Sequence, residues 1–236
     1  MEDYIKIDRI DKELDFVNLV ITTTNIDAKN EEDLVNTFNE DEFTLTNLTK
    51  NTQIHSSIVN KIDESNIGQR IDGDALITNV KKVPLLILTA DCVPVVIIDP
   101  KNKAIGVAHA GWRGTFEQIA RKTIEAMEKN YNSNPQDLIC AIGPSIGPCC
   151  YEVSKDLVEK FNTNLAKYAG KFDIMKDDKN YLDLWKINEL TLKDCKVKEE
   201  NIINLEICTN CNADKFYSYR KHEKTPKRIG TIIQIR

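Results

Sequence analysis

Three side chains in this sequence, His55, Cys92 and His109, are of the types that bind zinc. Zinc favours imidazole nitrogen and thiolate sulfur, and a catalytic zinc takes three protein ligands and leaves a fourth position for water or substrate. Two histidines and one cysteine make such a set. Each of them alone is more often an ordinary core or surface residue, so the prediction rests on their combination with the sequence around them.

Two acidic residues in the same half of the chain could support these ligands. Asp91 directly precedes Cys92, and Asp74 follows a glycine turn in the same half of the chain. A carboxylate can accept the second N–H of a ligating imidazole and so fix its orientation. It could instead accept a substrate hydroxyl or carry a proton. A turn or capping role explains each acid equally well, so both are candidates for catalytic residues.

The segment after His109 has features of an anion site. Gly111 and Gly114 let the backbone bend closely, a helix predicted to begin near Thr115 presents free N–H groups, and Arg113 adds a planar cation. Such a turn would hold a phosphate or a carboxylate. The glycine spacing is weak by itself, and Arg113 could pair with a structural carboxylate instead, but the neighbouring metal ligand favours the anion site.

Four further cysteines raise a second metal possibility. Cys208 and Cys211 have the spacing of a zinc knuckle. Their partners would be Cys149 and Cys150, but adjacent side chains point to opposite sides of an extended chain. We therefore interpret these four residues as packed thiols.

The apolar pattern predicts the elements that position these residues. Continuous apolar runs are typical of central strands, and spacing of three to four residues is typical of helices. His55 would lie on or beside a strand, and the loop 143–148, with Ser145 as a substrate-binding candidate, would wall a pocket. Predicted strands cover 16–24, 75–78, 83–89, 95–98, 104–108, 138–142, 202–207 and 229–235, and predicted helices cover 31–39, 116–130, 184–194 and a segment from about 154.

We expect residues 1–236 to form a single α/β domain, with a central mixed β-sheet flanked by helices. Apolar residues make up 41% of the 236 and charged residues 29%, as in globular proteins. The net charge of −5 argues against nucleic-acid binding. No signal peptide or membrane span is evident. We therefore expect a cytoplasmic protein, with its cysteines reduced, and in the absence of an apolar heptad a monomer.

Five motifs resemble, in chain order, the signatures of one family. It is the laccase-domain family, long labelled multicopper polyphenol oxidases and now described as purine nucleoside phosphorylases. The likeness runs from Gln53 to the end of the chain. The motifs are Gly73-Asp74-Ala75-Leu76-Ile77-Thr78, Thr89-Ala90-Asp91-Cys92-Val93-Pro94-Val95, His109-Ala110-Gly111-Trp112-Arg113-Gly114, Gly143-Pro144-x-Ile146-Gly147-x-Cys149-Cys150-Tyr151-Glu152-Val153 and Phe216-Tyr217-Ser218-Tyr219-Arg220.

The resemblance implies a zinc site at His55, Cys92 and His109, and it adds Gln53 and Arg220 to the substrate-binding candidates. It also implies an α/β domain that phosphorolyses adenosine, inosine and methylthioadenosine and hydrolytically deaminates adenosine. Purine nucleosides and phosphate would then be its partners. The chain departs from the family after Arg220, where Lys-His-Glu follows instead of the common Arg-Asp-Gly, and this departure bears on the substrate range.

Two other functions remain open at this point. The older family name suggests a copper-dependent phenol oxidase, but a multicopper centre normally uses many histidines and this chain has three. Copper is therefore the less favoured metal. A zinc-stabilised binding or regulatory module without catalysis would close the metal with a fourth protein ligand, and no fourth candidate lies near the three.

Overall fold

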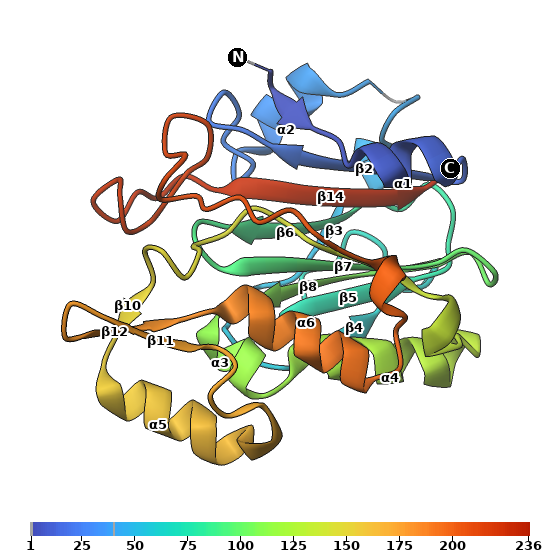
Figure 1. Ribbon diagram of the computed structural model, residues 1–236. Helices are drawn as coiled ribbons and strands as arrows, with labels where there is room; N and C mark the ends of the chain where they lie inside the picture. Colours follow the sequence, from blue (N-terminus) through green and yellow to red (C-terminus); the bar gives the residue numbers. More distant parts are fainter. Residues whose placement is uncertain (1, 40) are drawn as a thin grey trace.

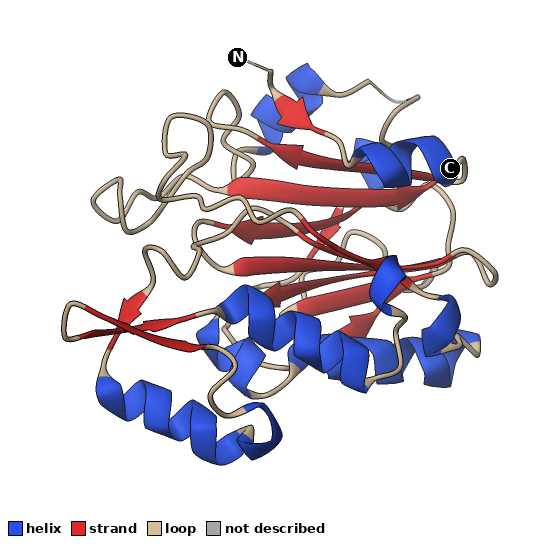
Figure 2. Ribbon diagram, in the orientation of Figure 1, coloured by secondary structure: helices blue, strands red, loops and turns tan. Residues whose placement is uncertain are grey.

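Within residues 2–39 and 41–236, which the computed structural model describes, the strands form three sheets. Two of these sheets stack face to face, and helices cover the lower side of this pair as seen in Figures 1 and 2. The predicted class, mixed α/β with mixed sheets flanked by helices, is confirmed. The strands divide between two large sheets and one small one.

The large sheets stack on each other and contain parallel and antiparallel pairs. The six-stranded sheet has the order β13 (Ile202–Asn204), β9 (Ile139–Ile142), β7 (Val93–Asp99), β8 (Ala104–Ala110), β5 (Ala75–Thr78), β4 (Val59–Lys61). The five-stranded sheet has the order β1 (Tyr4–Ile5), β2 (Val17–Thr22), β14 (Ile229–Ile235), β6 (Leu85–Thr89), β3 (Thr49–Lys50).

Every residue of β7 and β8 is buried, because the six-stranded sheet is covered on both faces. Val95 and Ile97 point into the core shared with the helices, whereas Val96 and Ile98 point into the core shared with the five-stranded sheet. Alternate side chains of a strand face opposite ways, so a strand covered on both faces is apolar throughout. This explains the continuous apolar runs of the sequence.

Two helices cover the outer face of the six-stranded sheet, α4 (Ile119–Tyr131) and α6 (Leu184–Asp194) (Figure 1). The apolar residues of α4 recur at helical spacing and are buried. The helix predicted over 116–130 is present as α4, but its predicted start near Thr115 is wrong. A short helix, α3 (Trp112–Phe116), begins directly after Gly111, and Gln118, in the left-handed conformation, separates it from α4.

The small sheet lies beside the main body, at the left in Figure 1, with α5 (Lys155–Asn164) below it. Its order is β10 (Glu152–Val153), β12 (Lys179–Leu182), β11 (Asp173–Lys176). The remaining helices are α1 (Asp8–Glu13), α2 (Glu31–Thr37) and the short 3-10 helices Leu45–Asn47, Pro135–Asp137, Ala166–Tyr168 and Glu199–Asn201. None of the helices described is both long and apolar enough to cross a membrane.

Candidate metal centre and active site

The pairing of β7 with β8 places two of the three predicted metal ligands together. The strands are antiparallel, with Pro94 opposite His109, so Cys92 at the start of β7 lies beside the end of β8. His55 comes from the loop between β3 and β4. The imidazole nitrogens and the Cys92 sulfur that could hold a metal all lie within 4.8 Å of one another, and the two histidine rings are 4.9 Å apart.

Gly111 leaves the space that this grouping needs. A Cβ atom at Gly111 would lie 3.0 Å from the sulfur of Cys92 and 3.4 Å from Cδ2 of His55. The first distance is shorter than van der Waals contact between carbon and sulfur, so a side chain here would displace the thiol. The first glycine of the His-Ala-Gly-Trp-Arg-Gly motif, Gly111, is therefore explained by its closeness to Cys92 and His55.

Asp74 lies behind the ligands and holds two of them in place. Its side chain is fully buried. Oδ1 is 2.8 Å from Nδ1 of His109 and accepts a hydrogen bond from the backbone N–H of His55 at 3.1 Å, and Oδ2 accepts from the N–H and the hydroxyl of Ser56. A proton on Nδ1 leaves Nε2 of His109 free to bind a metal. Asp74 therefore orients the site, and it does not reach the cavity described below.

The electrostatics of this cluster favour a thiolate. Burial raises the pKa of the Cys92 thiol, but the neighbouring His109 and His55 outweigh this effect and lower the pKa to about 6. Burial lowers the pKa of His109, whereas Cys92 and Asp74 raise it, to about 9. For Asp74 burial raises the pKa, and the hydrogen bonds from His109 and Ser56 bring it down to about 2. The thiolate is the form of cysteine that binds metals.

The donor set fits a catalytic zinc. Two imidazoles and one thiolate are ligands that zinc accepts, and among the described residues no fourth histidine, cysteine or carboxylate joins the group. His109 is only 3% exposed, but His55 is exposed and Cys92 is partly exposed. One side of the group is therefore open, as a catalytic metal requires and a purely structural one does not.

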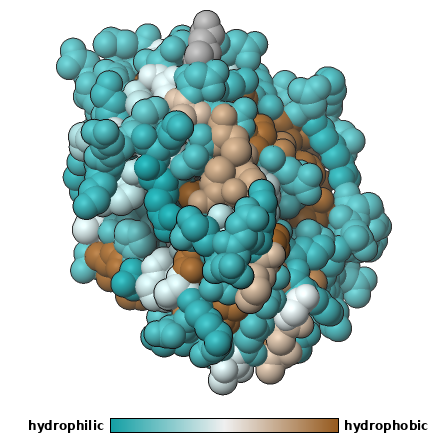
Figure 3. Space-filling view, turned by 60° about the vertical axis from the view of Figure 1, so that its left-hand side comes forward, coloured by the Kyte–Doolittle hydropathy of each residue, from teal (hydrophilic) through white to brown (hydrophobic). Residues whose placement is uncertain are grey.

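The open side faces a cavity of about 710 Å³. Figure 3 brings this side of the molecule forward and shows a largely hydrophilic face with smaller hydrophobic areas within it. A cavity of this size can hold a small organic molecule. It is lined by Lys29, Asn51, Gln53, His55, Leu88, Thr89, Ala90, Asp91, Cys92, His109, Trp112, Arg113, Ile146, Tyr151, Tyr219, Arg220 and Arg228.

Two predicted substrate contacts lie elsewhere. Ser145 is buried, accepts a hydrogen bond from the indole N–H of Trp185 at 2.6 Å and donates to the carbonyl of Gly143. Gly114 lies inside α3, packed against the carbonyl of His109. Neither belongs to the described lining of the cavity. Of the predicted anion-binding turn, Arg113 is the part that reaches the cavity.

Gln53 lines the cavity but gives its polar atoms to the protein. Its side-chain amide donates to the carbonyl of Leu88 and accepts from the N–H of Leu88, both at 2.8 Å. This pair of bonds fastens the His55 loop to β6. Gln53 therefore holds the His55 loop in this structure, and its role as a substrate contact stays a prediction.

Asp91 also has both carboxylate oxygens engaged. Oδ1 accepts from the hydroxyl of Thr209 and Oδ2 from the backbone N–H of Arg220, each at 2.7 Å. Its backbone is left-handed, with φ 83°, and its carbonyl accepts from Ile146. Asp91 thus ties two walls of the cavity to the start of β7, which leaves it poorly placed to carry a proton.

Further cationic and aromatic residues of the cavity are absent from the sequence-based candidates. Lys29 and Arg228 come together because their segments pair, the N–H of Ala28 donating to the carbonyl of Arg228. No local pattern indicates this pairing. Tyr151 and Tyr219, in contrast, lie inside recognisable motifs, and that position is a usable signal. Burial raises the pKa of Tyr151 to about 12, so its phenol keeps its proton at neutral pH.

The cations also contact the aromatic rings. The guanidinium of Arg113 lies 4.2 Å from the centre of the Trp112 ring, and that of Arg220 lies 5.3 Å from the Tyr151 ring. Such contacts hold the flat guanidinium groups in place. The cavity therefore combines fixed positive charge with flat apolar surfaces.

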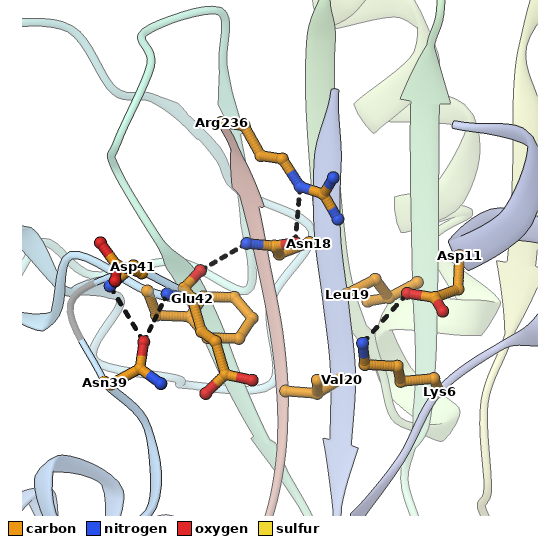
Figure 4. A pocket seen from close by; sticks show the side chains of 10 residues that line it. Lys6, Asp11, Asn18, Leu19, Val20, Asn39, Asp41, Glu42 and Arg236 are labelled. Carbon is orange, nitrogen blue, oxygen red and sulfur yellow. Dashed lines mark hydrogen bonds and ion pairs between the residues drawn. The ribbon is translucent and has the colours of Figure 1, made fainter. Parts of the chain in front are cut away.

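A second cavity, of about 400 Å³, lies at the other end of β2 and β14 (Figure 4). Its polar side chains bond within the protein. Arg236 donates to Asn18, Asn18 donates to the carbonyl of Glu42, and Lys6 pairs with Asp11. It contains no group of metal ligands among the described residues.

Comparison with known proteins identifies the family. The family model described as multi-copper polyphenol oxidoreductase laccase matches residues 12–236. The chain belongs to this family. Family members named purine nucleoside phosphorylase include one from Clostridium acetobutylicum, 34% identical over 188 residues that cover 77% of this chain and 74% of the relative.

Two other family comparisons define the extent of the likeness. The human purine nucleoside phosphorylase LACC1 is 35% identical over 164 residues, which are 68% of this chain but only 37% of LACC1. The chain thus matches little more than a third of that relative. The crystal structure of YlmD from Geobacillus stearothermophilus superposes with a TM-score of 0.84 at 27% identity and covers 95% of this chain and 94% of YlmD.

Proposed function

We propose that this protein is a zinc-dependent purine nucleoside phosphorylase. The observation that carries the proposal is the group of His55, Cys92 and His109, open on one side to a cavity with fixed cations and aromatic rings. The names of several relatives agree with the proposal. The proposed substrates are adenosine, inosine and methylthioadenosine, and the proposed second activity is hydrolytic deamination of adenosine.

The cavity offers separate chemistry for the two substrates of a phosphorylase. Phosphate is an anion, and positive charge comes from three segments, which supply Lys29, Arg113, and Arg220 with Arg228. A purine is flat and apolar on its faces, which suits an aromatic side chain such as Tyr219. Phosphorolysis forms a bond from a phosphate oxygen to C1′ of the ribose and breaks the bond from C1′ to the base.

The chain's own groups perform the binding and positioning. Arginines fixed against aromatic rings hold phosphate with little loss of side-chain freedom. The Tyr151 phenol can donate a hydrogen bond at neutral pH, and Asp74 fixes the two histidines. A zinc ion held by His55, Cys92 and His109 would supply a Lewis acid at the edge of the cavity.

We test the proposal with metal-free protein reconstituted separately with zinc and with copper. Each form is incubated with adenosine, with and without phosphate, and the products are separated by chromatography. We expect adenine that requires both zinc and phosphate, and inosine that requires zinc alone. Oxidation of a phenol by the copper form, with no nucleoside product from either form, would favour the oxidase instead.

Two variants assign the roles within the site. His109→Ala should abolish both products, since it removes a ligand. Arg113→Ala should raise the KM for phosphate about tenfold or more, as expected for one lost charge-assisted contact of about 1.5–3 kcal/mol. Arg9→Ala, which removes an arginine of α1 outside the cavity, is the matched control. An unchanged KM for phosphate in Arg113→Ala would remove Arg113 from the proposal.

If the protein were a non-catalytic zinc module, zinc would bind stoichiometrically and no nucleoside would react.

We further propose that residues 1–236 form a single domain that acts as a monomer in the cytoplasm. One cooperative unfolding transition and a monomeric elution volume test the first two of these statements, and localisation of a tagged chain in cells tests the third.

A further inference from the structure

Four cysteines gather at one place outside the candidate active site. The ligand atoms of Cys149, Cys150, Cys208 and Cys211 all lie within 4.8 Å of one another. The sulfur of Cys211 is 3.5 Å from that of Cys149 and 3.4 Å from that of Cys150. None of the four belongs to the described lining of the cavity.

The local backbone explains how adjacent cysteines point to one centre. The prediction that Cys149 and Cys150 face opposite sides of an extended chain is wrong. Residues 148–150 form a turn, in which the N–H groups of Cys150 and Tyr151 both donate to the carbonyl of Gly147 at 3.0 Å. In a helical turn neighbouring side chains are about 100° apart rather than opposed, so both sulfurs can reach Cys211.

We propose that these four cysteines bind a single structural zinc ion, separate from the metal of the active site. Four zinc–sulfur bonds of about 2.3 Å in a tetrahedron place the sulfurs about 3.8 Å apart, which agrees with the observed distances of 3.4 and 3.5 Å. Cys208 and Cys211 have the spacing of a zinc knuckle. Four thiolates at tetrahedral distances are typical of zinc or of iron, and zinc, which has no redox chemistry, is the usual metal of structural four-cysteine sites.

The backbone around Cys208 supports a thiolate at this position. The N–H of Gly147 donates to its sulfur at 3.2 Å. Amide hydrogen bonds to a sulfur stabilise its charged form. A neutral S–H is only a weak donor, so contacts between thiols alone would hold the four together poorly.

A disulfide explains the arrangement less well. Two disulfides would join each of the four cysteines to a single partner, which does not explain why the Cys211 sulfur lies equally close to those of Cys149 and Cys150. A single metal ion engages all four sulfurs. It also accounts for the convergence of two segments that are about sixty residues apart in the sequence.

The proposed zinc would clamp two walls of the active-site cavity together. The first wall continues from Cys150 into Tyr151, and the second continues from Cys211 towards Arg220. The segments already pair at Ser145 and Cys208, and the Arg220 guanidinium donates to the carbonyl of Glu152. Removing the clamp should therefore lower stability and loosen Arg220, without removing the other metal.

The test is the zinc content of the full-length chain, purified under reducing conditions and measured by mass spectrometry. We expect about two zinc ions per chain in the wild type, and about one in Cys211→Ser and in Cys149→Ser. Cys195→Ser, which removes a thiol that belongs to neither group, should keep two. Equal zinc content in the wild type and in both cluster variants would overturn the proposal.

X-ray absorption at the zinc edge provides a test that does not depend on the cluster variants. In His109→Ala, which loses the other site, the remaining zinc should show about four sulfur neighbours at about 2.3 Å and no nitrogen. Retained zinc with nitrogen or oxygen neighbours, or a disulfide among the four cysteines in the reduced wild type, would contradict the proposal. This proposal does not depend on the enzymatic activity, because metal content and coordination are measured without turnover.

Discussion

Replacing Asp74 by asparagine tests how the metal centre is positioned. The carboxylate accepts hydrogen bonds at both oxygens. Oδ1 faces His109 and the N–H of His55, and Oδ2 faces the N–H of Ile54 and two donors of Ser56. The amide of asparagine replaces one oxygen by a donor, so in either orientation at least two buried donors lose their acceptor.

The size of the effect follows from this count. A buried donor left without an acceptor costs about 1–3 kcal/mol, so two such donors lower the free energy of unfolding by roughly 2–6 kcal/mol. The orientation of His109 and of the His55 loop is lost at the same time. Loss of a carboxylate that orients a metal-bound histidine typically weakens metal binding by about 10–100-fold.

Two assays measure these effects. Competition with a chromogenic chelator gives the zinc affinity, and urea denaturation of the metal-free protein gives the free energy of unfolding. Asp72→Asn is the matched control, because it makes the same chemical change at an exposed position two residues away. We expect the control to lie within about 0.5 kcal/mol of the wild type. A zinc affinity of Asp74→Asn within about twofold of the wild type would refute the positioning role.

Three further predictions concern the same region. Gly111→Ala should weaken zinc binding at least about tenfold, because its Cβ would crowd the Cys92 sulfur, and this is read by the same chelator competition. Gln53→Ala should lower the free energy of unfolding by about 1–3 kcal/mol, because two bonds to the backbone of Leu88 are lost; urea denaturation measures it, and a change under about 0.3 kcal/mol would contradict the reasoning. The pKa of Asp74 in the metal-free fold is low, about 2, so its ionised carboxylate adds about 2 kcal/mol to the free energy of unfolding. This contribution is fully present above about pH 4 and is lost as the pH falls towards 2. When unfolding is followed against pH, Asp74→Asn should lack this part of the acid dependence.

The central strands and the closeness of Cys92 to His109 were predictable because their signals are local. A strand buried on both faces must be apolar throughout, and β7 and β8 are. Cys92 and His109 stand at the ends of these strands, and zinc accepts few residue types. The metal's preference for imidazole and thiolate therefore restricts the candidates to a few positions of the sequence.

The composition of the cavity wall was less predictable, for physical reasons. Lys29 and Arg228 meet through pairing between distant segments, which no local pattern shows. A polar side chain can face a cavity or bond to the backbone, and the sequence does not distinguish the two. Gln53 and Ser145 both bond within the protein. The convergence of the cysteine pair at 149 and 150 depends on a turn, which the sequence pattern does not distinguish from an extended segment.

Direct detection of ribose 1-phosphate tests the central claim most closely. Zinc-reconstituted protein is incubated with adenosine and phosphate, and adenine, hypoxanthine and ribose 1-phosphate are quantified over time. The proposed phosphorylase predicts as much ribose 1-phosphate as adenine and hypoxanthine together, because the inosine formed by deamination is also cleaved by phosphate. None of the three products should form without phosphate or in His109→Ala. Adenine without ribose 1-phosphate, or no reaction in protein that holds zinc at His55, Cys92 and His109, would contradict it.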